Sequence, residues 1–249
     1  SSKEFIADLE RWWNLFSGLA VAKRIQAPPI LAVSRRAYGF DHREAQNGAY
    51  YTRAYRKLKE AGIGTYILFQ ETYHKKAYEE LHPTGPKHDY RYHTEAMDRA
   101  MEGGIDDVGI GVLFGLDKYR YEFAGLLMHA EHLEAVHGVG PHTISVPRLK
   151  KADDIDPTQF DNGIDDEIFS KIIACIRIAV PYTGMIISTR ESEEVRKKAL
   201  SMGISQISGA SRTSVGGYTD KERPHDTEQF DVSDQRTLDE VVQWLMDLG

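Results

Sequence analysis

Hydrophobic and polar positions along the chain follow two alternating patterns. Short runs rich in β-branched residues are typical of buried strands, and the longer amphipathic stretches between them are typical of helices. The predicted strands span 30–33, 65–70, 107–114, 142–146, 184–189 and 205–208. The predicted helices between and after them span 48–61, 90–103, 119–137, 164–180, 191–202 and 236–248. Alternation of this kind predicts parallel strands joined by crossover helices.

The predicted strands also indicate how the sheet is covered. Segment 107–114 is apolar at nearly every position, as expected for a strand that is buried on both faces. Six β/α units are two short of the closed eight-stranded barrel. We therefore predict an α/β fold, namely an incomplete (half-type) parallel β/α TIM-like barrel of about five to six strands.

The N-terminal segment departs from this alternation. Its apolar residues recur at steps of three and four and share one helix face: Phe5, Leu9, Trp12, Phe16 and Leu19. Such a helix either covers the protein's own core or forms an interface. We therefore divide the chain into an N-terminal helix with its connecting segment, 1–50, and a partial barrel, 51–249.

Composition narrows the possible partners. The 249 residues carry a formal net charge of -7, and no basic stripe follows any predicted helix, so nucleic acid is not expected as a partner. A single cysteine excludes an intramolecular disulfide and fits a reducing compartment, so we expect a cytoplasmic location. No run of about 18 apolar residues occurs, and we expect no association with a membrane.

Six strings from Tyr55 onward form a distinctive series: YRKLKEAGIGTYILFQETYH, LHPTGPKHDY, AMDRAMEGGIDDVGIGVLFGL, LLMHAEHLEAVHGVGPHTISVPRL, AVPYTGMIISTRE and SQISGASRTSVGGY. In this order they resemble the second half of the radical-SAM tyrosine lyases, in the branch that matures FeFe-hydrogenase. The tyrosine lyases of thiamine synthesis share the ETY, PR and STRE elements. The string GVGPHTISVPR favours the hydrogenase branch.

The resemblance implies a barrel that binds S-adenosylmethionine and a 4Fe-4S cluster and splits tyrosine between Cα and Cβ. These 249 residues depart from that pattern because they contain neither the CxxxCxxC loop nor the CxxC-containing segment, and residues 1–50 do not resemble the family. Thiolates hold such clusters, and one cysteine cannot supply them. We therefore expect neither a 4Fe-4S cluster nor S-adenosylmethionine, whereas an iron-containing or other metal cofactor stays open.

The resemblance also points to a set of residues at the carboxyl ends of the predicted strands, where β/α barrels carry their active sites. The set is Glu71, Tyr73, Arg148, Arg190, Ser211 and Arg212. In the family, the ETY element faces the cavity and the arginines resemble groups that hold a carboxylate, a task that suits a forked guanidinium. Alternatively, Glu71 caps a helix or pairs with an arginine, and the arginines form salt bridges with Glu71, Glu191 or Asp107.

Histidine and cysteine offer few further ligands. His142 opens the strand 142–146, and the resemblance implies that it ligates iron, although a lone histidine is more often structural. His129 and His132 of the HAEH string are three residues apart, and a solvated helix face is favoured there because a catalytic zinc site needs three protein ligands. Cys175 lies in an apolar helix and is expected to pack in the core.

Three functions remain compatible with the sequence. The first is a degenerate, non-radical relative of the maturase that keeps an anion-lined cavity and binds a small molecule or a metal cofactor. The second is a non-radical enzyme acting on a small carboxylated or phosphorylated substrate, and the third is a non-catalytic interaction module. Because an open barrel exposes strand edges and its inner wall, we also expect a homodimer that covers them.

Overall fold

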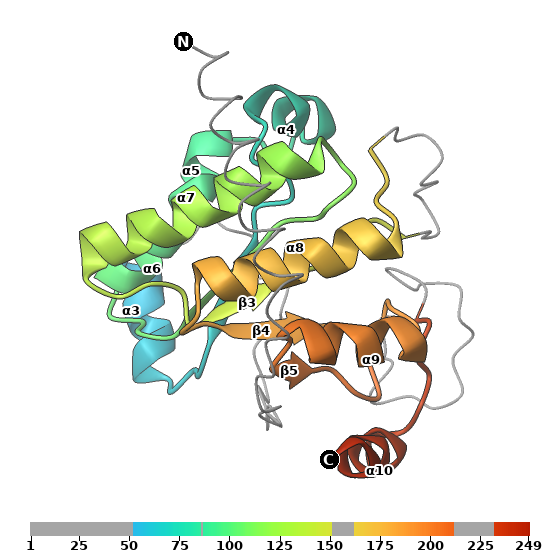
Figure 1. The fold of residues 1–249 in the computed structure, drawn as a ribbon. Helices are drawn as coiled ribbons and strands as arrows, with labels where there is room; N and C mark the ends of the chain where they lie inside the picture. The colour runs from blue at the N-terminus through green and yellow to red at the C-terminus, as the bar shows by residue number, and fades with distance from the viewer. Residues whose placement is uncertain (1–51, 86, 151–161, 212–231) are drawn as a thin grey trace.

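The computed structural model describes residues 52–85, 87–150, 162–211 and 232–249. Within them, five parallel strands form one sheet in sequence order (Figure 1). The strands are β1 (Tyr66–Phe69), β2 (Val108–Gly111), β3 (Thr143–Ser145), β4 (Gly184–Ile187) and β5 (Gln206–Ile207). This consecutive order is that of a barrel wall, and it confirms the predicted half-type barrel.

The two faces of the sheet differ in side-chain size. One face buries Leu68, Ile110, Ile144 and Met185 at one level of the register, and these side chains belong to the main core. At the next level, the opposite face presents Phe69, Gly111, Ser145 and Ile186. A Cβ added at Gly111 would lie 2.9 Å from the Phe69 ring and from the Ser145 carbonyl oxygen, so that position has no room for a larger side chain.

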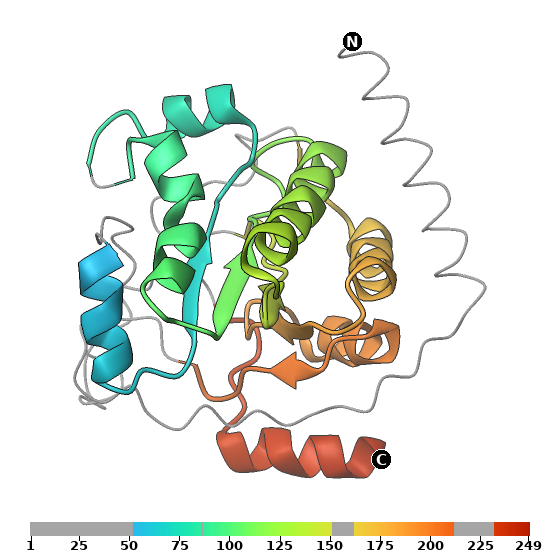
Figure 2. The same ribbon diagram turned by 90° about the vertical axis from the view of Figure 1, so that its left-hand side faces the viewer.

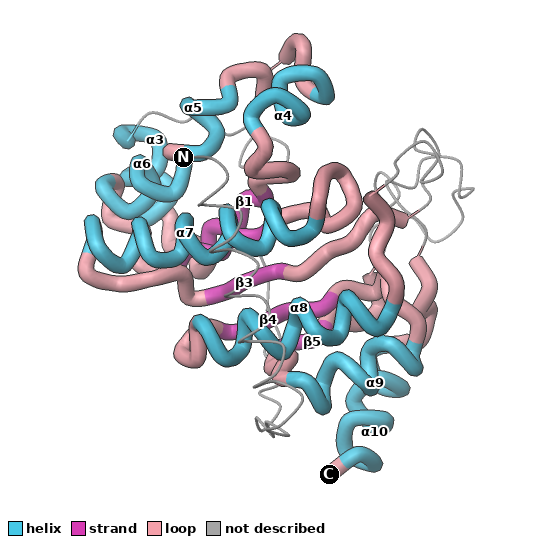
Figure 3. The backbone as a smooth tube through the Cα atoms, turned by 45° about the horizontal axis from the view of Figure 1, so that its top comes forward, coloured by secondary structure: helices cyan, strands magenta, loops and turns pink. Residues whose placement is uncertain are grey.

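Helices cover the face that holds the core. They are α3 (Thr52–Glu60), α4 (Lys75–Leu81), α5 (Tyr90–Thr94), α6 (Ala96–Glu102), α7 (Tyr119–His137), α8 (Asp166–Ala179), α9 (Glu193–Met202) and α10 (Leu238–Leu248). Figure 2 shows α6, α7, α8 and α9 following one another around the curve of the sheet. Figure 3 places α4 and α5 together at one end of the molecule and α10 at the other, beyond β5.

Most of the predicted elements in the described residues are confirmed. Helix α7 has the bounds predicted for it, and it ends at Gly138, whose φ of 76° caps the helix in the left-handed region. The predicted helix 90–103 is divided at Glu95 into α5 and α6, and α4 was missed because Tyr78 is its one buried residue. The predicted strand 30–33 and the N-terminal helix lie outside the described residues.

No helix in the described part of the chain is long and apolar enough to cross a membrane. Cys175 is fully buried in α8 and belongs to the main core, as expected from its apolar surroundings.

Candidate functional site

Glu71 follows β1 at the carboxyl edge of the sheet. Its φ of 67° lies in the left-handed region, which a glutamate rarely adopts. The Lys87 ammonium donates to Glu71 Oε1 at 2.6 Å, and both side chains are largely shielded from solvent. Of the alternatives left open by the sequence, pairing with a cation is therefore what the structure shows, although the partner is a lysine and not an arginine.

Arg148 closes the same edge after β3 and lies in a dense ion-pair network. Its Nε and Nη2 donate to the two carboxylate oxygens of Glu191 at 2.8 and 2.6 Å. Nη2 also donates to Asp166 at 2.5 Å, and Nη1 donates to the Ile164 carbonyl at 3.1 Å. Because these contacts engage all three guanidinium nitrogens, the structure shows the salt-bridge alternative for Arg148.

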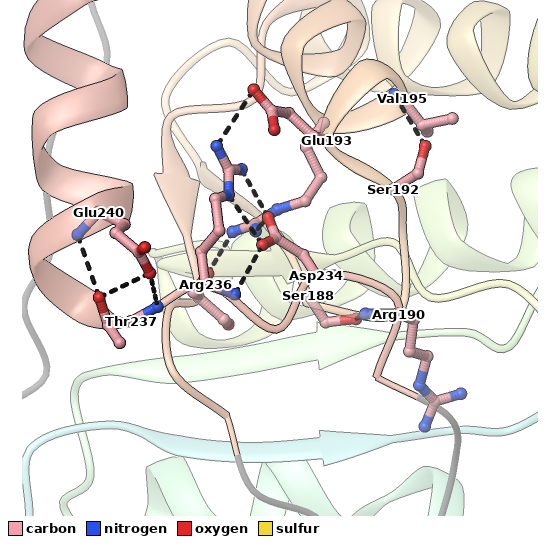
Figure 4. Close-up of polar contacts among 11 residues, drawn as sticks. Ser188, Arg190, Ser192, Glu193, Val195, Asp234, Arg236, Thr237 and Glu240 are labelled. Atoms are coloured by element: carbon pink, nitrogen blue, oxygen red, sulfur yellow. Dashed lines mark hydrogen bonds and ion pairs between the residues drawn. The ribbon is translucent and has the colours of Figure 1, made fainter.

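Arg190 follows β4 and lies at the same edge. Burial lowers the pKa of its guanidinium, while the nearby carboxylates of Glu71 and Glu191 act to raise it. Arg190 is thus a half-buried cation that follows the end of β4. Figure 4 shows the Arg190 side chain extending away from the ion-pair cluster around Asp234.

The other two predicted anion-binding residues follow β5. Ser211 is partly buried and lies at the end of a described range. Ala210 before it has a φ of 52°, so the backbone turns sharply there. Arg212 lies outside the described residues, as does the rest of the SRTSVGGY segment.

A buried ion-pair cluster beside this edge was not predicted from the sequence. Asp234 pairs with Arg196 and, at 2.6 Å, with Arg236, and the Asp234 and Arg196 side chains are 2% and 0% exposed (Figure 4). The two guanidinium groups keep the pKa of Asp234 below its usual value despite its burial. This cluster fastens the segment before α10 to α9.

Tyr73 departs from the position expected for the ETY element. Its side chain is buried against α7, where its hydroxyl bonds His129 Nδ1 at 2.9 Å. The Tyr73 backbone N–H donates to Glu122 Oε2 at 2.7 Å, and the Thr72 hydroxyl donates to the other oxygen of that carboxylate. Tyr73 therefore lies in the helical layer, whereas Glu71 pairs at the carboxyl edge.

Glu122 and His129 are both perturbed by this burial. Desolvation raises the pKa of Glu122 to about 7, against its two hydrogen bonds, and it lowers the pKa of His129 to about 4. The solvated helix face expected for the HAEH string is thus wrong for His129. Both residues could have been found in the sequence, because they share a helix face with Leu126 and Leu133.

His142 lies far from the other predicted residues in the barrel. It precedes β3, at the amino edge of the sheet, and its side chain is 64% exposed with Nδ1 3.4 Å from Asp107. Among the described residues, no three or more His, Cys, Asp or Glu side chains are grouped so that they could hold a metal ion.

Comparison with known proteins agrees with this geometry. The family model of the Biotin and Thiamin Synthesis associated domain (BATS) matches residues 145–249. The 2-iminoacetate synthase of Escherichia coli (strain K12) is 31% identical over 190 residues, which are 76% of this chain and 49% of that protein. The enzyme of the same name from Salmonella typhimurium (strain LT2) is 31% identical over 197 residues, covering 78% and 51%.

Solved structures of three proteins are also similar to this chain. A crystal structure of HydG, described as a maturase of the [FeFe]-hydrogenase, is 55% identical with a TM-score of 0.76 and covers 81% of this chain and 43% of its own. HydG from Carboxydothermus hydrogenoformans is 45% identical with a TM-score of 0.72, covering 80% and 45%. Methylornithine synthase, at 18% identity and a TM-score of 0.59, shares the fold.

The chain spans about half the length of the curated relatives that it matches. The sequence match, the BATS domain and the parallel half barrel all point to the same group of proteins. This chain is a partial radical-SAM-like relative of 2-iminoacetate synthase and the hydrogenase maturase HydG.

Proposed function

We propose that this chain is a non-radical relative of HydG that binds a small carboxylated or phosphorylated molecule at the carboxyl edge of its sheet, as a carrier or accessory protein. The observation that carries the proposal is the position of Arg190, a half-buried cation that follows β4 at the carboxyl edge, where β/α barrels bind their ligands. A forked guanidinium matches the geometry of a carboxylate or phosphate.

The non-radical part of the proposal rests on the ligands that these 249 residues can offer. Cys175 is the single cysteine, and it is 0% exposed in the core of α8. An iron–sulfur cluster needs several thiolates facing one cavity. The residues present therefore do not fit a 4Fe-4S cluster, and we assign no step to one.

A metal cofactor is the weaker form of the proposal. His142 is isolated at the amino edge, and Asp107 is the one carboxylate recorded beside it among the described residues. A mononuclear metal site normally needs three protein ligands or more. The anion at the opposite edge is therefore the better-supported ligand.

The anion proposal can be tested with a matched pair of small molecules. L-tyrosine and tyramine share a ring and an amine, but tyramine lacks the carboxylate. We expect L-tyrosine to bind at least about tenfold more tightly than tyramine by isothermal titration calorimetry, because the carboxylate gains a charge-assisted hydrogen bond worth about 1.5–3 kcal/mol. Inorganic phosphate should compete with L-tyrosine.

Variants locate the effect. Arg190→Gln should remove the preference for L-tyrosine while leaving tyramine unchanged. Arg91→Gln is the matched control, since the Arg91 side chain is 85% exposed on α5. Equal affinity for the two molecules, or a preference that survives Arg190→Gln, would contradict the proposal.

We also propose that the chain forms a homodimer in the cytoplasm. Within the described residues β1 and β5 are the outer strands of the sheet, and Ile67 on its open face is 37% exposed; a second copy would cover these edges and this face. Light scattering on the purified chain tests this: a dimer has twice the 28.2 kDa mass of one chain, and a monodisperse monomer would exclude it.

A further inference from the structure

A cavity of about 360 Å³ lies between α5, α6 and α7, in the helical layer and apart from the carboxyl edge. Three tyrosine rings contribute to its wall, from Tyr73, Tyr90 and Tyr121, and Met128 adds a thioether at its exposed side. Its volume falls at the small end of cavities that bind small molecules, which hold about 300–1,000 Å³. The wall fits a molecule of one ring and few other atoms.

Helix α7 approaches Tyr73 closely in the wall of the cavity. Gly125 lies in the middle of α7, where glycine costs about 1 kcal/mol relative to alanine. A Cβ at that position would lie 2.5 Å from Cγ of Tyr73. The glycine therefore lets the Tyr73 side chain approach the helix backbone closely and bring its hydroxyl to His129.

One buried polar atom in the wall has no partner. His129 Nδ1 is bonded to the Tyr73 hydroxyl, while Nε2 of the same ring is buried without a hydrogen-bond partner among the described residues. An unmade hydrogen bond in such a place costs about 1–3 kcal/mol. Native proteins rarely keep such an atom unless a water or a ligand completes it.

The hydrogen-bonding role of His129 Nε2 depends on the protonation states of Tyr73 and His129. Burial raises the pKa of Tyr73 and lowers that of His129 to about 4, so both groups are neutral at pH 7. We assign the Tyr73 hydroxyl as the donor to Nδ1, because no other acceptor for this hydroxyl is found among the described residues, and this assignment leaves the ring proton on Nε2. The unpartnered atom is therefore a hydrogen-bond donor on a residue that lines the cavity.

The two carboxylates in the wall already have hydrogen-bond partners. Asp98 Oδ1 accepts from His132 at 2.8 Å and from His137 at 2.9 Å, and Glu95 pairs with Arg91 at 2.7 Å. An anion would meet these carboxylates, and a cation would have to compete with their partners. A neutral ligand avoids both costs.

We propose that this cavity binds a small neutral aromatic molecule carrying a hydrogen-bond acceptor, which accepts from His129 Nε2 while the ring packs among Tyr73, Tyr90 and Tyr121. The proposal concerns a site separate from Arg190 and does not depend on the function proposed above.

Four probes that share a benzene ring test the chemistry of the site: benzyl alcohol, ethylbenzene, benzylammonium and benzoate. Affinity is measured by NMR titration, following the ¹³C-labelled methyl group of Met128. We expect benzyl alcohol to bind about tenfold more tightly than ethylbenzene, since ethylbenzene leaves the donor unsatisfied. Both ions should bind more weakly than benzyl alcohol.

Variants assign the effect to the buried nitrogen. His129→Leu should abolish the tenfold advantage of benzyl alcohol, whereas His88→Leu, in an exposed loop, should keep it. If His129→Leu does not fold, Ala124→Leu is the second variant, because it fills the cavity and should weaken all four probes. Arg190→Gln should leave benzyl alcohol binding unchanged, which separates this test from that of the proposed function.

Three results would overturn the inference: equal affinity for benzyl alcohol and ethylbenzene in the unmodified protein, stronger binding of either ion, or an advantage of benzyl alcohol that survives His129→Leu. The ring ¹⁵N shifts of His129 give an independent readout. Benzyl alcohol should move the Nε2 resonance and preserve its proton, while ethylbenzene should leave that resonance in place.

Discussion

The carboxyl edge of the sheet and the helical layer behind β1 both bury ionisable groups, and they stabilise them in opposite ways. At the edge, Arg148 and Glu191 meet in a two-pronged ion pair. Behind β1, Glu122 and His129 lack a full countercharge, and burial drives both towards their neutral forms. The carboxyl edge therefore pairs its ionisable groups, and the helical layer behind β1 favours their neutral forms.

The difference predicts two kinds of response to change. A paired charge is sensitive to loss of its partner, because the remaining charge is left buried. A neutralised group is sensitive to pH, because its pKa differs between the folded and unfolded chain. The experiments below separate these responses, from the largest expected effect to the smallest.

Removing one partner at the carboxyl edge should have the largest effect. Glu191→Ala leaves the Arg148 guanidinium, 5% exposed, with Asp166 as its remaining carboxylate partner. We expect a loss of about 3–5 kcal/mol in the free energy of unfolding, measured in urea at pH 7. Glu79→Ala is the control, since Glu79 pairs with Lys75 on the surface at 3.7 Å and should change little. Comparable losses in both variants would show that pairing at the edge is no stronger than at the surface.

The next effect is the pH dependence due to Glu122. The pKa of Glu122 is about 7 in the folded protein against an ordinary value of 4.5, so the unfolded chain loses this proton first as the pH rises. Stability from this group is therefore fully present below pH 4.5 and falls as the pH rises to about 7, by on the order of 3 kcal/mol. The unfolding free energy of Glu122→Gln should lack that decline.

Two features sharpen the Glu122 experiment. His129 acts in the opposite direction, because its lowered pKa costs stability as the pH falls from 6.5 towards 4, so the unmodified protein should show a flatter profile than either group alone. Glu80→Gln on the surface is the control. If Glu122→Gln and the unmodified protein have parallel profiles from pH 4.5 to 7, the carboxyl group is ionised in the fold.

In both regions, the sequence predicted the helices and strands better than the positions of the side chains. Helix α7 was predicted with its observed bounds, because its apolar face is continuous and Gly138 ends it. The strand order followed from the alternation of strands and helices. Helix α4 buries Tyr78 alone, too little for a periodic signal.

The directions of the side chains at the end of β1 could not be predicted from the pattern of hydrophobic and polar residues. Alternation along a strand would place Glu71 and Tyr73 on the same side, as the prediction assumed. The left-handed φ of Glu71 breaks that alternation, so Thr72 and Tyr73 both reach α7. No propensity predicts a left-handed glutamate, and this one residue separates the two regions.

Arg148 illustrates a second limit. Its sequence neighbours suit an anion site, and its partners Glu191 and Asp166 are distant in the chain. A forked guanidinium serves a ligand carboxylate and a protein carboxylate equally well. Only the packing of β3 against the residues after β4 decides between them.

The smallest loss of stability is expected from a change at the contact between Gly125 of α7 and Tyr73. In Gly125→Ala, the new methyl group would overlap the Tyr73 ring, at 2.5 Å from Cγ and 2.6 Å from Cβ. Overpacking of this kind costs about 1–3 kcal/mol, and the better helix propensity of alanine returns about 1 kcal/mol. We expect a net loss of about 1 kcal/mol in urea unfolding, with Tyr73 displaced from His129.

Gly64→Ala provides the matched control for that experiment, because nothing lies within 4 Å of a Cβ at Gly64 and its φ is not positive. That variant should be as stable as the unmodified protein or slightly more so, since alanine restricts the unfolded chain. The decisive readout is benzyl alcohol binding. If Gly125→Ala keeps it, the Tyr73 ring does not depend on its contact with α7, and the cavity is not built by that close approach.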